Sequence, residues 1–334
     1  MLGVGCGLAA GALWGLVFLA PELASEFTPL QLAAGRYLAY GALAAALLAP
    51  RWRTVSAAIG RREWIGLSWL SVLGNTLYYV LLASAVQMGG VAMTSVVVGF
   101  LPVAVTVIGS RDQGAVPLRR LVPSLAMGAA GVVCIAWQSL DAAAPGSEAR
   151  ALVGLACAIG ALAYAAPGSE ARALVGLACA IGALASWTAY AVWNGRWLAR
   201  MQHVSAHDWS LLTGVATGAQ AIVLAIPAAL IGASAHASAG WARFLVVSAG
   251  VAIFASIVGN AFWNRASRLL PLTLVGQMIL FETLFALLYG FLWEQRWPTP
   301  AELAAIALMV ASVITCVSAH RPRQGVPHAQ DQQA

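Results

Sequence analysis

Amide and aromatic side chains recur at helical spacing within apolar stretches of this sequence, where they could bind a small solute. They form two groups of three residues: Asn75, Tyr78 and Tyr79 in the first, and Asn260, Trp263 and Asn264 in the second. In each group the spacing i, i+3 and i+4 places the three side chains on one helix face. Amides orient a solute by hydrogen bonding, and aromatic rings pack against it. Hydrogen bonding and packing between neighbouring helices is the alternative role.

Further candidate binding residues lie elsewhere in the apolar stretches. Trp14 and Trp187 occupy matching positions in the two halves of the chain, and Tyr190 continues the helix face of Trp187. Gln277 adds a polar side chain to another long apolar run. A tryptophan can instead anchor a helix at the membrane surface. Trp187 lies deeper in its run than such an anchor, so it is the better candidate of the two.

A carboxylate and a guanidinium also lie inside apolar stretches, where a charged group is costly and is a functional hypothesis by default. Helix rise places Glu282 ~17 Å from one end of its stretch and Arg36 ~9 Å from an end of its own. Glu282 could carry a coupling proton. Glu282 and Arg36 could instead form a structural ion pair or a pair that acts as a gate. The sequence leaves these coupling and gating roles open.

Membrane-spanning helices must position these residues. Of the 334 residues, 61% are hydrophobic and only 9% are charged, whereas soluble proteins carry about 25% charged residues. A spanning helix needs ~20 apolar residues, and such runs recur from end to end. We therefore predict an all-α integral membrane protein with about ten transmembrane helices. Their ranges are 2–20, 30–48, 64–86, 91–110, 121–140, 173–193, 209–231, 244–266, 271–293 and 303–319.

Local signals support this division. Segments 28–31 (TPLQ) and 299–302 (TPAE) each place Thr at N-cap, Pro at N1 and Gln or Glu at N3, which is the capping box of a helix start. Glycines recur at every fourth position, which favours close packing between helices of the same chain over dimerisation. These glycines are Gly3, Gly7, Gly11 and Gly15 in the first run, and Gly214 and Gly218 in the seventh.

The distribution of arginine predicts the orientation. The sequence has no Lys, and most of its 18 basic residues fall in alternate loops and in the C-terminal tail. By the positive-inside rule both termini are cytoplasmic, in a multi-pass protein of a bacterial-type inner (plasma) membrane. The net charge of +6 is then loop charge, and we expect no nucleic-acid partner. Without Lys, no nucleotide-binding P-loop is possible.

The two halves of the chain resemble each other. Gly74-Asn75 in the third run matches Gly259-Asn260 in the eighth, as Trp14 matches Trp187. We predict five-helix repeats at 1–140 and 173–320, followed by a cytoplasmic tail at 321–334. An odd number of spans makes the second repeat inverted relative to the first. Inverted repeats are common in secondary transporters, which bind substrate at the repeat interface.

The connection between the repeats contains a different kind of duplication. Residues 143–163 are identical to residues 165–185. The second copy continues into a long apolar run and supplies the sixth span. The first copy gives a shorter run, and a further span would reverse the arginine bias of every later loop. We therefore predict that 141–172 is an extracytoplasmic connection.

With these features the sequence resembles the EamA-type branch of the drug/metabolite transporter superfamily. The resemblance follows the order of loose motifs along nearly the whole chain, with Thr283 standing where the family usually has Pro. These motifs are Ala12-Leu13-Trp14-Gly15, Pro29-Leu30, Arg36-Tyr37, Pro102 with Gly109, the small-residue run 128–131, and Phe281-Glu282 with Gly290 and Trp293-Glu294. The resemblance implies a ten-helix carrier that exports or exchanges small metabolites, such as amino acids, without a nucleotide.

We therefore expect a secondary transporter that works by alternating access on a small amphipathic solute in the lipid bilayer, with protons as one candidate coupling ion. No cofactor, metal or catalytic residue is expected. An intramembrane enzyme is one alternative, but it would need paired His, Asp or Glu within the spans, where only Glu282 is present. A non-transporting membrane subunit is the other alternative, and it would not need matched polar groups in both halves.

Overall fold

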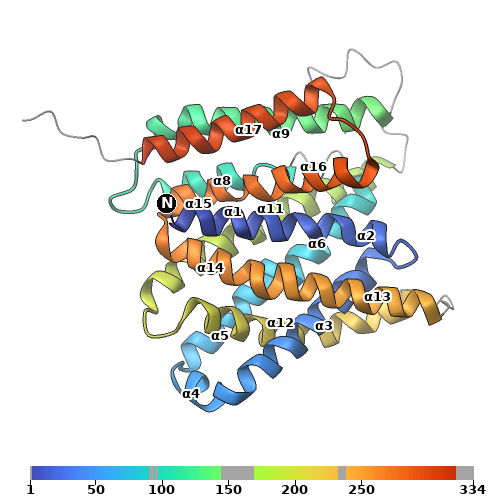
Figure 1. Cartoon of the computed structure of the whole chain (residues 1–334), viewed down its shortest axis with the longest axis vertical. Coiled ribbons are helices and arrows are strands. Elements are labelled where there is room, and N and C mark those ends of the chain that lie inside the picture. Colours follow the sequence, from blue (N-terminus) through green and yellow to red (C-terminus); the bar gives the residue numbers. More distant parts are fainter. Residues whose placement is uncertain (1, 90–93, 95–96, 144–168, 232–237, 321–334) are drawn as a thin grey trace, which may run out of the picture.

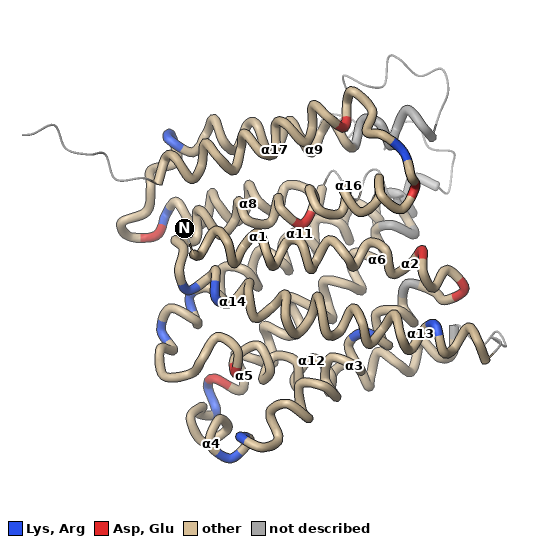
Figure 2. The backbone as a smooth tube through the Cα atoms, in the orientation of Figure 1, with Lys and Arg blue, Asp and Glu red and all other residues tan. Residues whose placement is uncertain are grey.

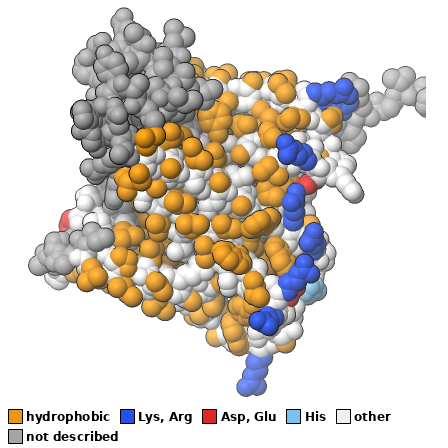
Figure 3. All heavy atoms as spheres, turned by 180° about the vertical axis from the view of Figure 1, so that it is seen from behind, with side chains coloured by type: hydrophobic (Ala, Val, Ile, Leu, Met, Phe, Trp, Pro, Cys, Tyr) orange, Lys and Arg blue, Asp and Glu red, His pale blue; other side chains and the backbone are white. Residues whose placement is uncertain are grey.

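The computed structural model describes residues 2–89, 94, 97–143, 169–231 and 238–320, and this part of the chain forms helices and no strand. It contains nine helical stretches long and apolar enough to cross a membrane. Side chains on its outer surface include Leu230, Val246 and Leu292, which are 75%, 72% and 67% exposed. Figure 3 shows an apolar face of this kind, with arginines along one edge. An all-α membrane protein is therefore confirmed.

The first five predicted spans correspond to helices that lie between helices of the second half of the chain (Figure 1). The fourth predicted span is described only in part: its second half is the short helix α8, and most of 90–96 lies outside the described residues. The elements are α1 (Leu2–Gly15), η1 (Leu16–Leu19), α2 (Ala20–Leu23), α3 (Pro29–Leu48), η2 (Ala49–Arg51), α4 (Trp52–Ala57), α5 (Arg61–Ser71), η3 (Val72–Thr76), α6 (Leu77–Gly89), α8 (Leu101–Gly109) and α9 (Leu118–Ala143).

The later spans follow after the connection. Residues 144–168, with most of the first duplicated copy, lie outside the described part, as does the predicted tail 321–334. The second copy leads into helix α11, which covers the predicted span 173–193. The elements are α11 (Ser169–Arg200), α12 (Ala206–Ile231), α13 (Ser238–Val251), η6 (Ala252–Gly259), α14 (Asn260–Leu269), α15 (Leu272–Met278), α16 (Leu280–Glu294) and α17 (Pro300–Ala319).

Local sequence explains where several helices start and bend. Thr28 and Thr299 accept hydrogen bonds at the starts of α3 and α17, so both predicted capping boxes are confirmed. The third and eighth spans each contain a π-helical segment, η3 and η6. The ninth span is broken at Ile279, between α15 and α16, although it has no Pro there.

Helices from the two halves of the chain pack against each other. α3 pairs with α12, α9 with α17, α6 with α11, and α8 with α15, while α1 lies between α14 and α16. The glycine stripe of α1 faces the ninth span, because a Cβ on Gly7 or Gly11 would lie within 3 Å of Met278 or Phe281. The predicted packing within one chain is therefore confirmed for this stripe.

Two backbones approach each other closely where α3 packs against α12. A Cβ built on Gly41 would lie 2.4 Å from Cα of Gly218, and one on Gly218 would lie 2.5 Å from Cα of Gly41. Such a contact forces the backbones apart, because neither side has a flexible side chain that could move away. Glycine is therefore required at both positions.

We predict that Gly41→Val will lower the yield and the melting temperature of the purified protein, since overpacking costs about 1–3 kcal/mol. The matched control is Gly250→Val, because a Cβ at Gly250 meets nothing within 4 Å. Size-exclusion chromatography and a thermal melt in detergent measure both effects. Equal behaviour of the two variants would contradict the tight contact between α3 and α12.

Candidate functional site

A cavity of ≈330 Å³ lies inside the bundle, and helices from both halves of the chain line it. Its apolar wall includes Val17, Leu82 and Ile279, and the exposed side chains of Phe18 and Pro21 reach its rim at the α2 end. Most of the binding and coupling residues predicted from the sequence line this one cavity. They are Trp14, Arg36, Asn75, Tyr78, Tyr79, Trp187, Tyr190, Asn260 and Glu282.

The π-helical segments place the two matched asparagines in the lining. Gly74 and Asn75 lie within η3, and Asn260 follows Gly259 at the end of η6. Both glycines let an aromatic ring of the other half reach the backbone. A Cβ on Gly74 would lie 2.5 Å from the Tyr190 ring, and one on Gly259 would lie 3.0 Å from the Trp14 ring. π-helical turns are frequent at functional sites.

Three indole rings pack together at one side of the cavity. The ring centroid of Trp263 is 5.0 Å from that of Trp14 and 5.7 Å from that of Trp187. Trp14 donates its indole N–H to the carbonyl oxygen of Ala255 at 3.1 Å and to Oδ1 of Asn260 at 3.2 Å. The Trp263 side chain is 1% exposed, so it supports the two lining tryptophans from behind instead of lining the cavity as its sequence group suggested.

Asn75 is held by polar neighbours that the sequence analysis did not single out. Asn75 donates its amide to Oγ1 of Thr217 at 3.1 Å. Thr217 also hydrogen-bonds the hydroxyl of Ser71, at 2.7 Å. Hydroxyls of this kind occur throughout the apolar runs, so only their position after folding distinguishes Thr217. Tyr37 was also missed as a lining residue; its ring makes an edge contact with that of Tyr79.

The two charged residues face the cavity from opposite halves. Arg36 donates Nε–H to Oγ of Ser256 in η6 at 3.0 Å, and its guanidinium lies 5.4 Å from the Tyr37 ring centroid. Glu282 lies in the first turn of α16, just beyond the break at Ile279. Among the salt bridges of the described residues there is none between Arg36 and Glu282. In this conformation the two charges therefore face the same cavity without a salt bridge between them.

The other two predicted site residues, Asn264 and Gln277, lie outside the cavity lining and bond neighbouring helices. Asn264 accepts from Nδ2 of Asn194 at 2.8 Å. Oε1 of Gln277 accepts from the Ser312 hydroxyl at 2.9 Å, and its Nε2 lies 3.4 Å from Oγ1 of Thr106. Both side chains are almost fully buried. They therefore make the contacts between helices that were the alternative role for polar residues in this sequence.

Comparison with known proteins agrees with this arrangement. A model of the EamA-like transporter family matches residues 1–137. The chain is 32% identical to the inner membrane protein YtfF of Escherichia coli (strain K12), over 95% of each chain. It belongs to the EamA-like transporter family. The resemblance seen in the sequence is thereby confirmed. A crystal structure with 18% identity superposes with a TM-score of 0.71, covering 95% of this chain and 96% of the other, and shows the shared fold.

Membership of the EamA-like family makes the chain a multi-pass membrane transporter. Within the described residues, the chemistry available to the site is that of the cavity wall. That wall offers one cation, one carboxylate, two amides and a set of aromatic rings. Such groups can bind, desolvate and orient a solute.

We predict that Trp263→Ala and Tyr78→Ala will differ in their effect on stability, because Trp263 supports the cavity wall from behind and Tyr78 lines it. Removing the fully buried Trp263 ring should cost about 3–5 kcal/mol and reduce the amount of folded protein, because it leaves a void under two other rings. Tyr78 lines the cavity and is only partly buried, so its alanine variant should melt close to the unmodified protein. Thermal melts of both purified variants test this, and equal destabilisation would contradict the assignment.

Proposed function

We propose that this EamA-like transporter exports or exchanges small amphipathic solutes, such as amino acids, across the inner membrane by alternating access. The observation that carries the proposal is the central cavity, where Arg36 and Glu282 face one space between aromatic walls. A zwitterion matches this wall, since its carboxylate suits the guanidinium, its ammonium suits the carboxylate, and its apolar part suits the rings. The volume of the cavity is within the range of small-molecule sites.

The inverted-repeat architecture is part of the proposal, and the helix contacts support it. Exchanging the two predicted repeats, 1–140 and 173–320, turns the contact between α1 and α14 into that between α11 and α6. It also turns the contact between α1 and α16 into that between α11 and α8, and it leaves the pairs α3–α12 and α9–α17 unchanged. The π-helical segments η3 and η6 exchange as well. We therefore propose that a pseudo-two-fold axis relates the two halves around the cavity, the arrangement of secondary transporters built from inverted repeats.

Orientation follows from the arginines. Figure 2 shows most of them at the end of the bundle that holds the start of α1 and the end of α17. We assign this end to the cytoplasm, with both termini there. The rim residues Phe18 and Pro21 then lie toward the opposite side, and the tryptophan cluster lies on the cytoplasmic side of the cavity. This arrangement corresponds to an outward-facing state.

The solute is best identified by comparing metabolites in the medium of cells with and without the protein. A solute that accumulates outside only when the protein is present is then tested for uptake and exchange in proteoliposomes. Specific exchange would support the proposal. Absence of any protein-dependent flux, for a folded protein and a broad set of metabolites, would favour a non-transporting membrane subunit.

We predict that Glu282→Gln will abolish flux driven by a pH gradient while solute counterflow without a gradient survives, because the variant keeps the shape and removes the titratable group. Arg36→Gln should weaken solute binding and leave folding intact, since Arg36 bonds Ser256 and not Glu282. The control is Glu26→Gln, which removes an exposed carboxylate that does not line the cavity.

Two outcomes would contradict the roles given to Glu282 and Arg36. If both single variants lose folded protein and the double variant recovers it, the two charges form a structural pair that this conformation does not show, since one buried charge left unpaired costs several kcal/mol. If Glu282→Gln retains gradient-driven flux, Glu282 does not carry the coupling proton.

A further inference from the structure

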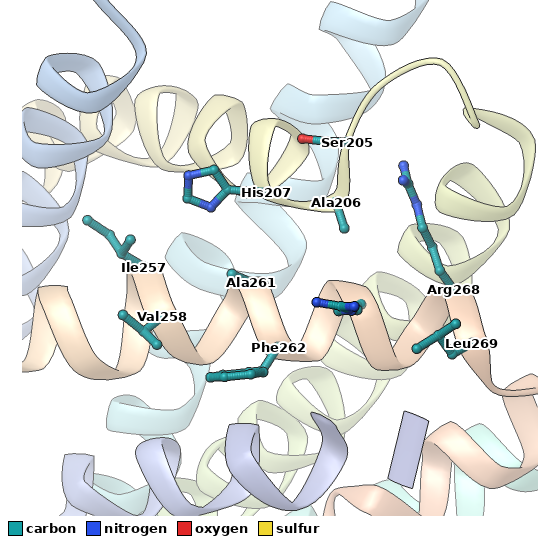
Figure 4. Close-up of a pocket in the computed structure, with 10 residues that line it drawn as sticks. Ser205, Ala206, His207, Ile257, Val258, Ala261, Phe262, Arg268 and Leu269 are labelled. Carbon is teal, nitrogen blue, oxygen red and sulfur yellow. The ribbon is translucent and has the colours of Figure 1, made fainter. Parts of the chain in front are cut away.

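A second hollow of ≈590 Å³ lies on the far side of η6 and α14 from the cavity, between these elements and the start of α12 (Figure 4). Its wall is apolar along most of its length, formed by Ile257, Val258, Ala261, Phe262 and Leu269. Val258 and Leu269 are 36% and 49% exposed. The hollow is therefore an open groove on the apolar surface of the bundle.

One end of the groove is cationic. Arg265 is exposed and forms no hydrogen bond or salt bridge within the described part of the chain. Arg268 extends from α14 toward the segment before α12, where its Nη2 donates to the carbonyl oxygens of Met201 and Val204 (Figure 4). Its Nε is buried and has no partner among the described residues. Two arginines of α14, three residues apart, thus line the same groove as the apolar side chains.

The start of α12 adds hydrogen-bond donors to the groove, and its one acidic side chain is already paired. Ser205 and the exposed His207 line the groove. Asp208, in the first turn of α12, accepts from the Ser205 hydroxyl at 2.8 Å and pairs with Arg51 at 2.8 Å. Free N–H groups in the first turn of a helix favour an anion. The charge at this end is therefore positive and uncompensated.

We propose that this groove binds an anionic phospholipid, with the phosphate at Arg265 and Arg268 and an acyl chain along Ala261 and Phe262. Guanidinium groups hold phosphate oxygens by charge-assisted hydrogen bonds, and the apolar wall buries hydrocarbon. Basic pockets between spanning helices at the cytoplasmic side are recognised headgroup sites. The arginine-rich end of the bundle supplies that position.

The bound lipid contacts the helix that also forms the transport cavity. Asn260 lines the cavity and Ala261 lines the groove, and they are adjacent at the start of α14. Ser256 of η6 bonds Arg36 in the cavity, and the next residue, Ile257, lines the groove. A lipid in the groove therefore contacts η6, α14 and the start of α12 together and stabilises their packing.

Native mass spectrometry of the detergent-purified protein with phosphatidylglycerol or phosphatidylcholine tests the site. We expect phosphatidylglycerol to be retained preferentially. Arg265→Gln should lower its apparent affinity about fivefold, the effect of one basic residue near an anionic headgroup. Ala261→Trp should fill the groove and remove the preference. The matched control is Arg62→Gln, an exposed arginine outside the groove lining that should change nothing.

Equal retention of the two lipids by the unmodified protein would overturn the proposal. So would unchanged phosphatidylglycerol binding in both groove variants, with folding verified by a thermal melt without lipid. Loss of a protein dimer in Ala261→Trp, without any change in lipid binding, would assign the groove to a second copy of the chain. Because the experiment measures lipid binding, its result does not depend on whether the protein transports the proposed solute.

Discussion

The hydrogen bonds of Trp14 are the constraint on which the cavity depends. The indole N–H reaches the Ala255 carbonyl and the Asn260 amide of the other half of the chain. In a bilayer such groups find no water, so they must be satisfied within the protein. The π-helical segment η6 and Gly259 let the ring come close enough. Trp187 and Trp263 then pack around it, and the ring cluster closes one side of a space that remains open on the other.

Close packing elsewhere leaves two charged side chains facing this space. Glycine contacts hold α3 against α12 and α1 against the ninth span, while buried amides such as Gln277 join α15 to α17. The hydrogen bonds of these amides satisfy polar groups outside the cavity lining. Arg36 and Glu282 remain the charged groups of the cavity lining, and keeping them in a membrane protein is costly. A solute that carries both charges would compensate that cost, which links the fold to the proposed transport.

Much of this arrangement can be read from the sequence because its signals are local. Capping boxes at Thr28 and Thr299 define helix starts, and apolar length defines spans. Periodicity places side chains on a helix face but does not give their depth, so Trp263 was grouped with Asn260 although it lies behind the lining. A π-helical turn also shifts the register of the residues that follow it in the same helix, and no sequence pattern predicted η3 or η6. Thr217 and Tyr37 were missed because only tertiary contacts distinguish them.

The most direct test of the account is a structure of the protein with a solute that an export screen has identified. The account predicts that the solute lies in the cavity between the two halves, with polar contacts to Arg36 or Glu282 and its apolar part against the aromatic wall. A transported solute bound outside this cavity, or bound in it without contact to either charged residue, would contradict the central claim.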